Sequence, residues 1–293
     1  MQLTEGYMPY CGYQTYYRVI GDLKNEQKPL VLLHGGPGSA HNYFELLDPL
    51  AADGRALVMY DQLGCGRSAT PSRPDLWTAE TWVKELMALR EHLDLRDIHL
   101  LGQSWGGMLA IQYLCDQQPE GINSLILSST LPSADLWAQE QMRLIRLLPE
   151  DQQQAIRRAI ANDNFTEPDY LAANEHLMLR HSAAPVTADS PEPLRRKKAS
   201  GREAYVTAWG PNEFYPKGTL KGWDYRHKLP DLSIPTLITS GTDDLSTPLI
   251  AKTMQDLIPN ARWELFAQSR HMPFVEETHA YLGLLEHWLP AHD

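Results

Sequence analysis

Short apolar runs recur along the chain, rich in Val, Leu and Ile and bounded by Gly or Asp. Continuous runs of this kind are typical of strands that are buried on both faces. We predict a strand in each of "PLVLLHGG", "RALVMYDQLG", "DIHLLGQSWGG", "INSLILSST", "PTLITSGTDD" and "ARWELFAQS". Helical spacing separates several of these runs, as in residues 81–93, whose apolar face carries Trp82, Leu86, Leu89 and Leu93. The alternation predicts an α/β fold with a mostly parallel sheet and helices on both faces.

The alternation stops after Pro132 and resumes near Leu229. Between these points, "ADLWAQEQMRLIRLLPEDQQQAIRRAI" and "EPDYLAANEHLMLRH" have helical spacing, whereas "SAAPVTADSPEP" and "WGPNEFYPKG" have the composition of loops. We therefore predict one core formed by residues 1–132 and 229–293, and an inserted, largely helical cap formed by residues 133–228. The cap is expected over the carboxyl edge of the sheet, where ligands bind in open α/β folds.

Composition narrows the range of partners. With 26 Lys and Arg against 37 Asp and Glu, the chain carries a formal net charge of -11, which disfavours binding to nucleic acid or to an anionic membrane surface. The only basic run, "RRKK" at residues 195–198, is expected to be a solvated loop. The beginning "MQLTEGYMPYCG" lacks a basic start followed by an apolar segment, and no stretch is long enough to span a bilayer, so we expect a cytoplasmic protein.

The sequence gives no sign of a metal or a cofactor. Cys11, Cys65 and Cys115 are scattered without metal-ligand spacing, and an odd number of cysteines makes a disulfide framework improbable. No His-Glu-x-x-His motif is present, and "HGGPGS" lacks the Lys-Ser/Thr ending of a phosphate-binding loop. We expect a protein that works without a cofactor.

The segment "GQSWGG" at residues 102–107 carries the strongest chemical signal. It follows a predicted strand directly and opens a predicted helix, which is the setting of the nucleophile elbow of α/β hydrolases. In this motif a sharp turn exposes the serine, here Ser104, and glycines allow the neighbouring backbone to pass closely. The alternative is a glycine-rich turn with an incidental serine, and the strand-turn-helix context argues against it.

A nucleophilic serine needs a base, and the base needs an orienting carboxylate. In this fold the chain order is Ser, then acid, then His. His271 follows the last predicted strand and precedes a predicted amphipathic helix, so it is the candidate base. The acid is expected in "GTDDLSTP", where either Asp243 or Asp244 could reach His271, although adjacent side chains point in different directions.

Backbone N–H groups must also stabilise the oxyanion that forms during acyl transfer. One donor is expected to be the residue after the nucleophile, Trp105. The second should come from the loop after an early strand, and "LLHGGPG" supplies such a loop. Its glycines allow close approach of the backbone, and Pro37 stiffens the turn.

These motifs together resemble the proline iminopeptidases, α/β-hydrolase serine exopeptidases that remove N-terminal residues, often proline, from peptides. The similar blocks are "HGGPG" at 34–38, "YDQLGCGRS" at 60–68, "GQSWGG" at 102–107, "GTDDLSTP" at 241–248 and "SRHMPF" at 269–274. The resemblance implies an α/β-hydrolase fold with Ser104 as nucleophile, His271 as base, and Gly36 and Trp105 as oxyanion donors. The family pattern Gly-x-x-Asp-x-x-x-Pro implies that Asp244, rather than Asp243, is the acid.

The resemblance also implies how the substrate is held. A cap glutamate binds the α-ammonium in this family, and "GPNEF" matches that segment and gives Glu213. Some members have a second acid where this chain has Leu245, so Glu213 would act alone or with another cap acid such as Glu175. Candidates for an apolar wall around a pyrrolidine ring are Trp209, Tyr205 and Phe44, each of which could equally be core packing.

The expected function is hydrolysis of the amide bond after an unblocked N-terminal residue, preferably proline. The expected substrates are short peptides or amino acid amides with a free N-terminus. One alternative keeps the fold and the triad but has a prolinamide-like amide, an ester or a lactone as substrate, since fold does not fix function. Another is a non-catalytic binding protein on the same scaffold, which would be expected to lack a triad residue.

Overall fold

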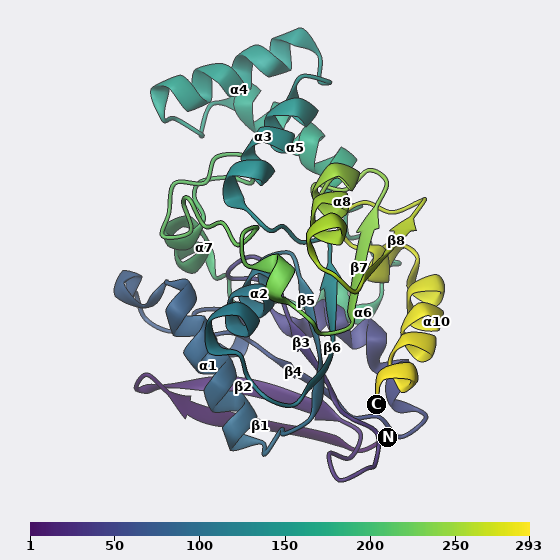
Figure 1. The fold of residues 1–293 in the computed structure, drawn as a ribbon. Coiled ribbons are helices and arrows are strands. Elements are labelled where there is room, and N and C mark those ends of the chain that lie inside the picture. The colour runs from purple at the N-terminus through teal and green to yellow at the C-terminus, as the bar shows by residue number, and fades with distance from the viewer.

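The chain is organised around one eight-stranded sheet with the strand order β1-β2-β4-β3-β5-β6-β7-β8. The structure is a computed structural model that describes residues 1–293 (Figure 1). Strands β3 to β8 run parallel, which confirms the predicted mostly parallel sheet, and all six predicted strands are present. These six strands are β3 (Leu30–Leu33), β4 (Leu57–Tyr60), β5 (Ile98–Gln103), β6 (Ile122–Ser128), β7 (Thr236–Gly241) and β8 (Ala261–Phe266).

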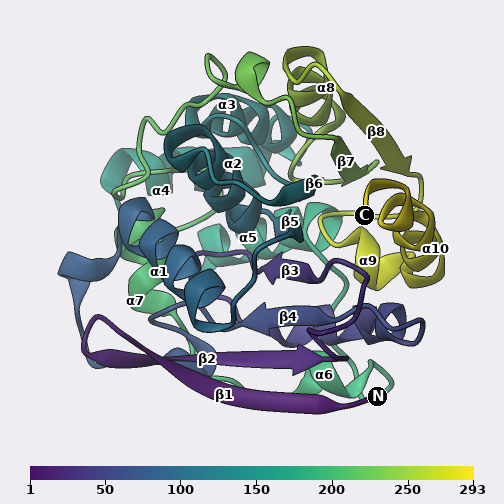
Figure 2. The same ribbon diagram turned by 60° about the horizontal axis from the view of Figure 1, so that its bottom comes forward.

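A hairpin that the pattern of apolar runs did not reveal forms one end of the sheet. Its strands, β1 (Leu3–Tyr10) and β2 (Tyr13–Ile20), are antiparallel, and β2 is also antiparallel to β4. Figure 2 shows the hairpin at one end of the sheet and β8 at the other. The turn residues Cys11 and Gly12 have φ values of 48° and 78°, as a two-residue type I′ turn requires. In the sequence, the dipeptide Cys-Gly between two tyrosine-rich segments was the signal that could have indicated this hairpin.

Helices cover both faces of the sheet. The apolar side chains of α1, α2 and α8 belong to one buried cluster, and those of α9, α10 and the 3₁₀ segment His41–Ala51 belong to another. Strand β3 separates the two clusters, because Val31 and Leu33 point to the first and Leu30 and Leu32 to the second. The helices are α1 (Ala79–His92), α2 (Trp105–Gln117), α8 (Pro248–Leu257), α9 (Pro273–Glu276) and α10 (Thr278–Trp288). None of the helices combines the length and apolar character needed to cross a membrane.

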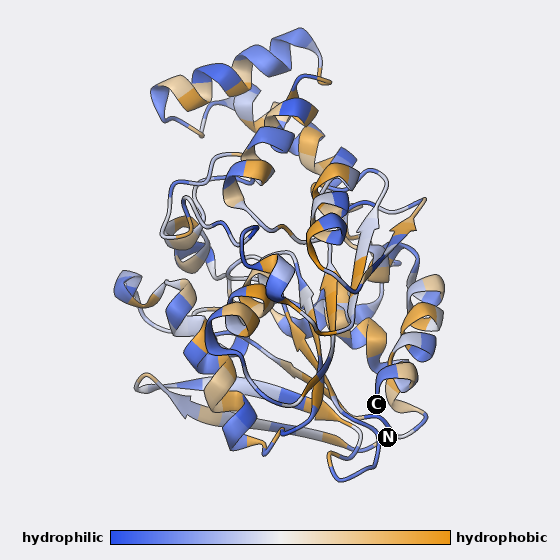
Figure 3. Ribbon diagram, in the orientation of Figure 1, coloured by the Kyte–Doolittle hydropathy of each residue, from blue (hydrophilic) through white to orange (hydrophobic).

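Five further helices lie between β6 and β7 in the sequence. They are α3 (Ala134–Ile145), α4 (Glu150–Asn162), α5 (Pro168–His181), α6 (Glu192–Arg195) and α7 (Arg202–Ala208). The helical pattern of residues 134–160 is divided in two, because α3 ends before Pro149 and α4 begins after it. Helices α3, α4 and α5 share a small hydrophobic cluster of their own with Phe214. Figure 1 shows them beyond the end of the sheet to which the arrow of β7 points, and Figure 3 shows both hydrophilic and hydrophobic residues along α4.

A buried carboxyl group connects the hairpin, α1 and the loop after β4. It belongs to Glu85, which lies on α1 and is fully buried; Thr15 Oγ1 is hydrogen-bonded to it, and the Leu63 N–H donates to it at 2.9 Å. The indole Nε1 of Trp82 donates to the Leu63 carbonyl at 3.1 Å, so the same loop is held from two positions on α1. Burial raises the pKa of Glu85 to about 8, although these hydrogen bonds oppose the shift.

This shift predicts a specific pH dependence of stability. The pKa of Glu85 is higher in the folded than in the unfolded chain, so the folded protein keeps a proton that the unfolded chain releases above about pH 5. The contribution of Glu85 to the free energy of unfolding therefore falls between about pH 5 and pH 8, by up to about 1.4 kcal/mol per pH unit. Glu85→Gln should gain stability relative to the wild type over this range. Urea unfolding at both pH values tests it, and an equal difference at the two pH values would contradict the assignment.

Candidate active site

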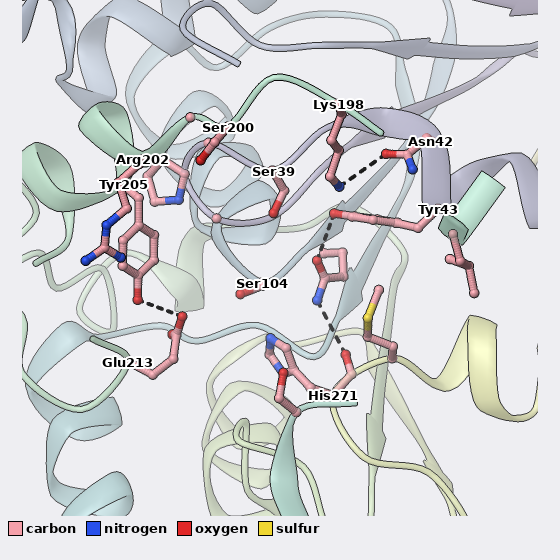
Figure 4. Close-up of a pocket in the computed structure, with 18 of the residues that line it drawn as sticks. Ser39, Asn42, Tyr43, Ser104, Lys198, Ser200, Arg202, Tyr205, Glu213 and His271 are labelled. Atoms are coloured by element: carbon pink, nitrogen blue, oxygen red, sulfur yellow. Dashed lines mark hydrogen bonds between the residues drawn. The ribbon is translucent and has the colours of Figure 1, made fainter. Parts of the chain in front are cut away.

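Ser104 occupies the turn between β5 and α2. Its backbone has φ 54° and ψ -122°, a strained conformation for a residue with a side chain. Two glycines make the turn possible, because a Cβ on Gly106 would collide with the carbonyl oxygen of Leu33 and one on Gly102 with that of Gly106. Helix α2 therefore packs directly against β3 and β5. Ser104 directly follows the last residue of β5, and its side chain lies among the residues that line the pocket (Figure 4).

Asp244 and His271 form a buried pair. Asp244 lies in the loop after β7 and is 1% exposed; it accepts hydrogen bonds from the N–H groups of Ser246 at 2.7 Å and Gly241 at 3.1 Å. Its Oδ1 lies 2.6 Å from Nδ1 of His271, which is 8% exposed. Two backbone N–H groups thus hold the carboxylate in place independently of its contact with the His271 ring. This geometry places the Nδ1 proton on the Asp244 side and leaves Nε2 to face the cavity.

The two neighbouring aspartates differ in their surroundings. Asp243 is exposed, and only its backbone takes part in the loop, where its carbonyl accepts from Nδ1 of His181 at 2.8 Å. Burial alone would lower the pKa of His271, but the charge and hydrogen bond of Asp244 outweigh it, so that pKa is raised. The structure joins Asp244, and not Asp243, to His271.

Ser104 and His271 line one cavity of about 450 Å³, a size typical of small-molecule sites. No hydrogen bond links the two side chains, although both point into the same space (Figure 4). Catalytic hydrogen bonds are often long in enzymes without substrate, so this geometry is compatible with proton transfer once a ligand is bound.

The glycine-rich loop after β3 lies against the start of α2. Gly36 has φ 116°, a conformation that favours glycine, and its N–H has no acceptor within the protein. Trp105 is the first residue of α2, where backbone N–H groups have no partner within the helix. The indole of Trp105 donates to Gln62 Oε1 at 2.8 Å, and Gln62 donates through its N–H to Nε2 of His34 at 3.0 Å. Gln62 therefore links the start of α2 to the glycine-rich loop that begins at His34.

Glu213 is the only carboxylate among the residues that line the cavity. Tyr205 also lines it and donates through its hydroxyl to Glu213 Oε1 at 2.7 Å. The Glu213 carbonyl accepts from the indoles of Trp137 at 2.7 Å and Trp209 at 3.3 Å, which fixes the backbone of this segment. Burial raises the pKa of Glu213, while the Tyr205 hydrogen bond and the charge of His271 oppose the rise.

Three of the sequence expectations for substrate contacts do not match the geometry. Phe44 is fully buried and packs against Phe274 with ring centroids 5.3 Å apart, so it belongs to the core and does not line the cavity. Trp209 lies behind Glu213 and supports it from outside the cavity. Glu175 is exposed on α5 and is absent from the cavity wall, whereas Leu245, 1% exposed, forms part of it.

Other cavity residues were missed by the sequence reasoning. Lys198 belongs to the basic run that was expected to be a solvated loop; it is exposed and lies in a loop as expected, but it also lines the cavity, and its Nζ donates to Asn42 Oδ1 at 3.2 Å. Tyr43 and Gln103 join the floor of the cavity to the glycine-rich loop, because Tyr43 Oη accepts from the Gly35 N–H at 2.6 Å and donates to Gln103 at 3.0 Å. No sequence motif marked these residues, since they come from separate segments.

Comparison with known proteins gives consistent matches. The family described as the alpha/beta hydrolase fold matches residues 28–278. A proline iminopeptidase of Clostridium botulinum is 60% identical over 293 residues, with 100% of both chains covered. One of Lactiplantibacillus plantarum is 61% identical over 287 residues, which cover 98% of this chain and 100% of that relative.

Solved structures agree with the sequence matches. The proline iminopeptidase of Mycobacterium smegmatis superposes with a TM-score of 0.86 at 33% identity, covering 99% of this chain and 98% of that one. The protein VinJ superposes with a TM-score of 0.89 at 34% identity, covering 99% of both chains. The resemblance inferred from the ordered sequence blocks is confirmed. The chain belongs to the proline iminopeptidase family of α/β hydrolases.

Proposed function

We propose that this protein is a prolyl aminopeptidase that hydrolyses the amide bond after an unblocked N-terminal proline through Ser104, His271 and Asp244. The observation that carries the proposal is one cavity in which an elbow serine and a carboxylate-oriented histidine stand opposite Glu213, the single acid that lines the cavity. Family membership at about 60% identity over the whole chain supports the same reaction.

Acylation begins with attack of Ser104 Oγ on the carbonyl carbon of the prolyl residue. His271 Nε2 takes the hydroxyl proton, and Asp244 stabilises the imidazolium that forms. The N–H groups of Gly36 and Trp105 donate to the developing oxyanion, and the positive end of α2 adds to this stabilisation. His271 then gives the proton to the leaving amine as the C–N bond breaks, which leaves a prolyl ester on Ser104.

Deacylation repeats the same steps with water. His271 takes a proton from a water molecule as the water oxygen attacks the ester carbonyl, and the same backbone donors stabilise the second oxyanion. The C–Oγ bond breaks, Ser104 recovers its proton from His271, and free proline leaves. The reaction consumes only water and the peptide, and Ser104 and His271 return to their starting states.

Glu213 would hold the free amine of the substrate. A prolyl ammonium placed against this carboxylate forms a charge-assisted hydrogen bond, which is strong where water is excluded. Burial raises the pKa of Glu213, and the substrate's positive charge would keep the carboxylate ionised. Because Leu245 gives the cavity an apolar wall where a second acid could stand, small prolyl amides should also fit the cavity.

Residues 133–228 would serve as a cap over residues 1–132 and 229–293. This segment contributes Glu213 and Tyr205 to the cavity, whereas Ser104, Asp244 and His271 come from the rest of the chain. The separate hydrophobic cluster of α3, α4 and α5 supports its description as a unit. Amine recognition and bond cleavage would then reside in different parts of the chain.

Amine recognition can be tested with a matched pair of substrates. The wild type should hydrolyse prolyl 4-nitroanilide far faster than its N-acetyl twin, because only the free amine can pair with Glu213. Glu213→Gln should lower kcat/KM for the free substrate by about 100-fold or more, since the ion pair is lost. Its kcat/KM for the acetylated twin should change little. Ser104→Ala is the control and should lose turnover of both. Equal rates for the two substrates in the wild type would refute ammonium recognition.

The pH profile tests the histidine pair. His271 must be neutral to act as a base, and its pKa is raised, so kcat/KM should rise through a limb above the ordinary histidine value of about 6.5. Asp244→Asn removes the charge that raises this pKa. It should move the limb to lower pH and reduce kcat by a factor on the order of 10⁴. Asp243→Asn is the matched control and should leave both unchanged. A limb that stays in place in Asp244→Asn would count against the pairing.

A further inference from the structure

The cavity carries opposite charges on the two sides of Ser104. Glu213 lies with Tyr205 on one side, and Lys198 lies with Asn42 on the other (Figure 4). Arg202, the other permanent cation that lines the cavity, stands beside Tyr205 on the Glu213 side. Lys198 is therefore the one fixed charge on the side that faces away from Glu213.

The ammonium of Lys198 has no acid partner. No carboxylate oxygen lies within 4.0 Å of its Nζ, whose only hydrogen bond is the one to Asn42 Oδ1 at 3.2 Å. An ammonium has three protons to donate, so two remain for a ligand. Arg196, two residues earlier in the same basic run, is by contrast paired with both Glu45 and Glu192. An unpaired cation beside a polar cavity is suited to an anion that arrives with the substrate.

The segment that carries Lys198 is anchored on both sides. Arg196 pairs with Glu45 at 2.6 Å, the Gly66 N–H donates to the Ala199 carbonyl at 3.1 Å, and the Gly201 N–H donates to the Gly38 carbonyl at 3.2 Å. The ammonium is therefore presented from a segment that is tied to the glycine-rich loop itself. A long flexible side chain gains most as a ligand when the backbone beneath it is fixed, because less freedom is lost on binding.

The reaction geometry defines which part of a substrate reaches Lys198. If the prolyl ammonium faces Glu213 and the scissile carbonyl lies at Ser104, the leaving portion of the peptide must extend away from Glu213. In a di- or tripeptide, that portion ends in a free carboxylate within one or two residues of the cleaved bond. This placement of the substrate rests on the proposed prolyl aminopeptidase function.

We propose that Lys198 is a specificity-determining residue that binds the C-terminal carboxylate of short peptide substrates, so that the enzyme selects zwitterionic di- and tripeptides over their amides. Glu213 and Lys198 then bind the two charged ends of the same substrate, its ammonium and its carboxylate. Asn42 orients the ammonium through its side-chain oxygen.

The test compares substrates that differ only at the C-terminus. They are prolylglycine and prolylglycylglycine, each as the free acid and as the carboxamide. In the wild type, kcat/KM should favour the acid about tenfold at one or both lengths, which corresponds to about 1.4 kcal/mol. Lys198→Met should abolish the preference, and Lys198→Arg should keep part of it. High salt should reduce it in the wild type, because the pair is partly exposed to solvent.

Controls separate this proposal from the function on which it rests. Lys197→Met changes an exposed neighbour that does not line the cavity, and it should keep the wild-type preference. In Ser104→Ala, calorimetry should show tighter binding of the acid than of the amide, and Lys198→Met in that background should remove the difference. Absence of prolyl hydrolysis by the wild type would overturn the proposed function, whereas equal affinities in Ser104→Ala would overturn the role of Lys198. A preference for acids that survives in Lys198→Met would also overturn it.

Discussion

The site depends on how closely α2 approaches the sheet behind Ser104. Gly102 and Gly106 remove the side chains that would otherwise collide with backbone at this point, and Ser104 accepts a positive φ as a consequence. The strain is local, while the strands and helices around it bury two large apolar clusters that stabilise it. The same contact brings the first N–H of α2 to the end of the sheet, beside the loop that contains Gly36. One packing constraint thus sets the positions of both Ser104 and these N–H groups, which we propose as the nucleophile and the oxyanion donors.

Buried polar side chains maintain this arrangement. Glu85 fixes the loop after β4 through Leu63, and the adjacent Gln62 holds the indole of Trp105 and the ring of His34. Each of these bonds satisfies a group that would be costly to bury alone. Few charged side chains line the cavity that these residues support. The cavity wall carries one acid, Glu213, and two basic residues, Lys198 and Arg202.

The sequence predicted the parts of the structure that have a local signature. Six apolar runs became β3 to β8, and Gly-x-Ser-x-Gly lies where a strand meets a helix. Phe44 was left open between the cavity wall and the core, because an aromatic residue near a glycine-rich loop can point either way, and tertiary packing places it in the core. The basic run was correctly expected to be exposed, but the sequence did not indicate that Lys198 also lines the cavity, since the cavity is formed by distant segments. Contacts between distant segments, such as Glu213 with Trp137, had no sequence signal.

In the proposed reaction, Ser104 attacks the carbonyl of a residue whose free α-amine is held by Glu213. The most direct measurement is the rate at which a diphenyl phosphonate analogue of proline modifies the protein, with mass spectrometry to locate the adduct. We expect modification of Ser104 alone, and at least about tenfold faster labelling by the free amine than by its N-acetyl derivative, since one ion pair in the cavity is worth about 1.4 kcal/mol or more. Labelling at another residue, or equal rates for the two probes, would contradict it.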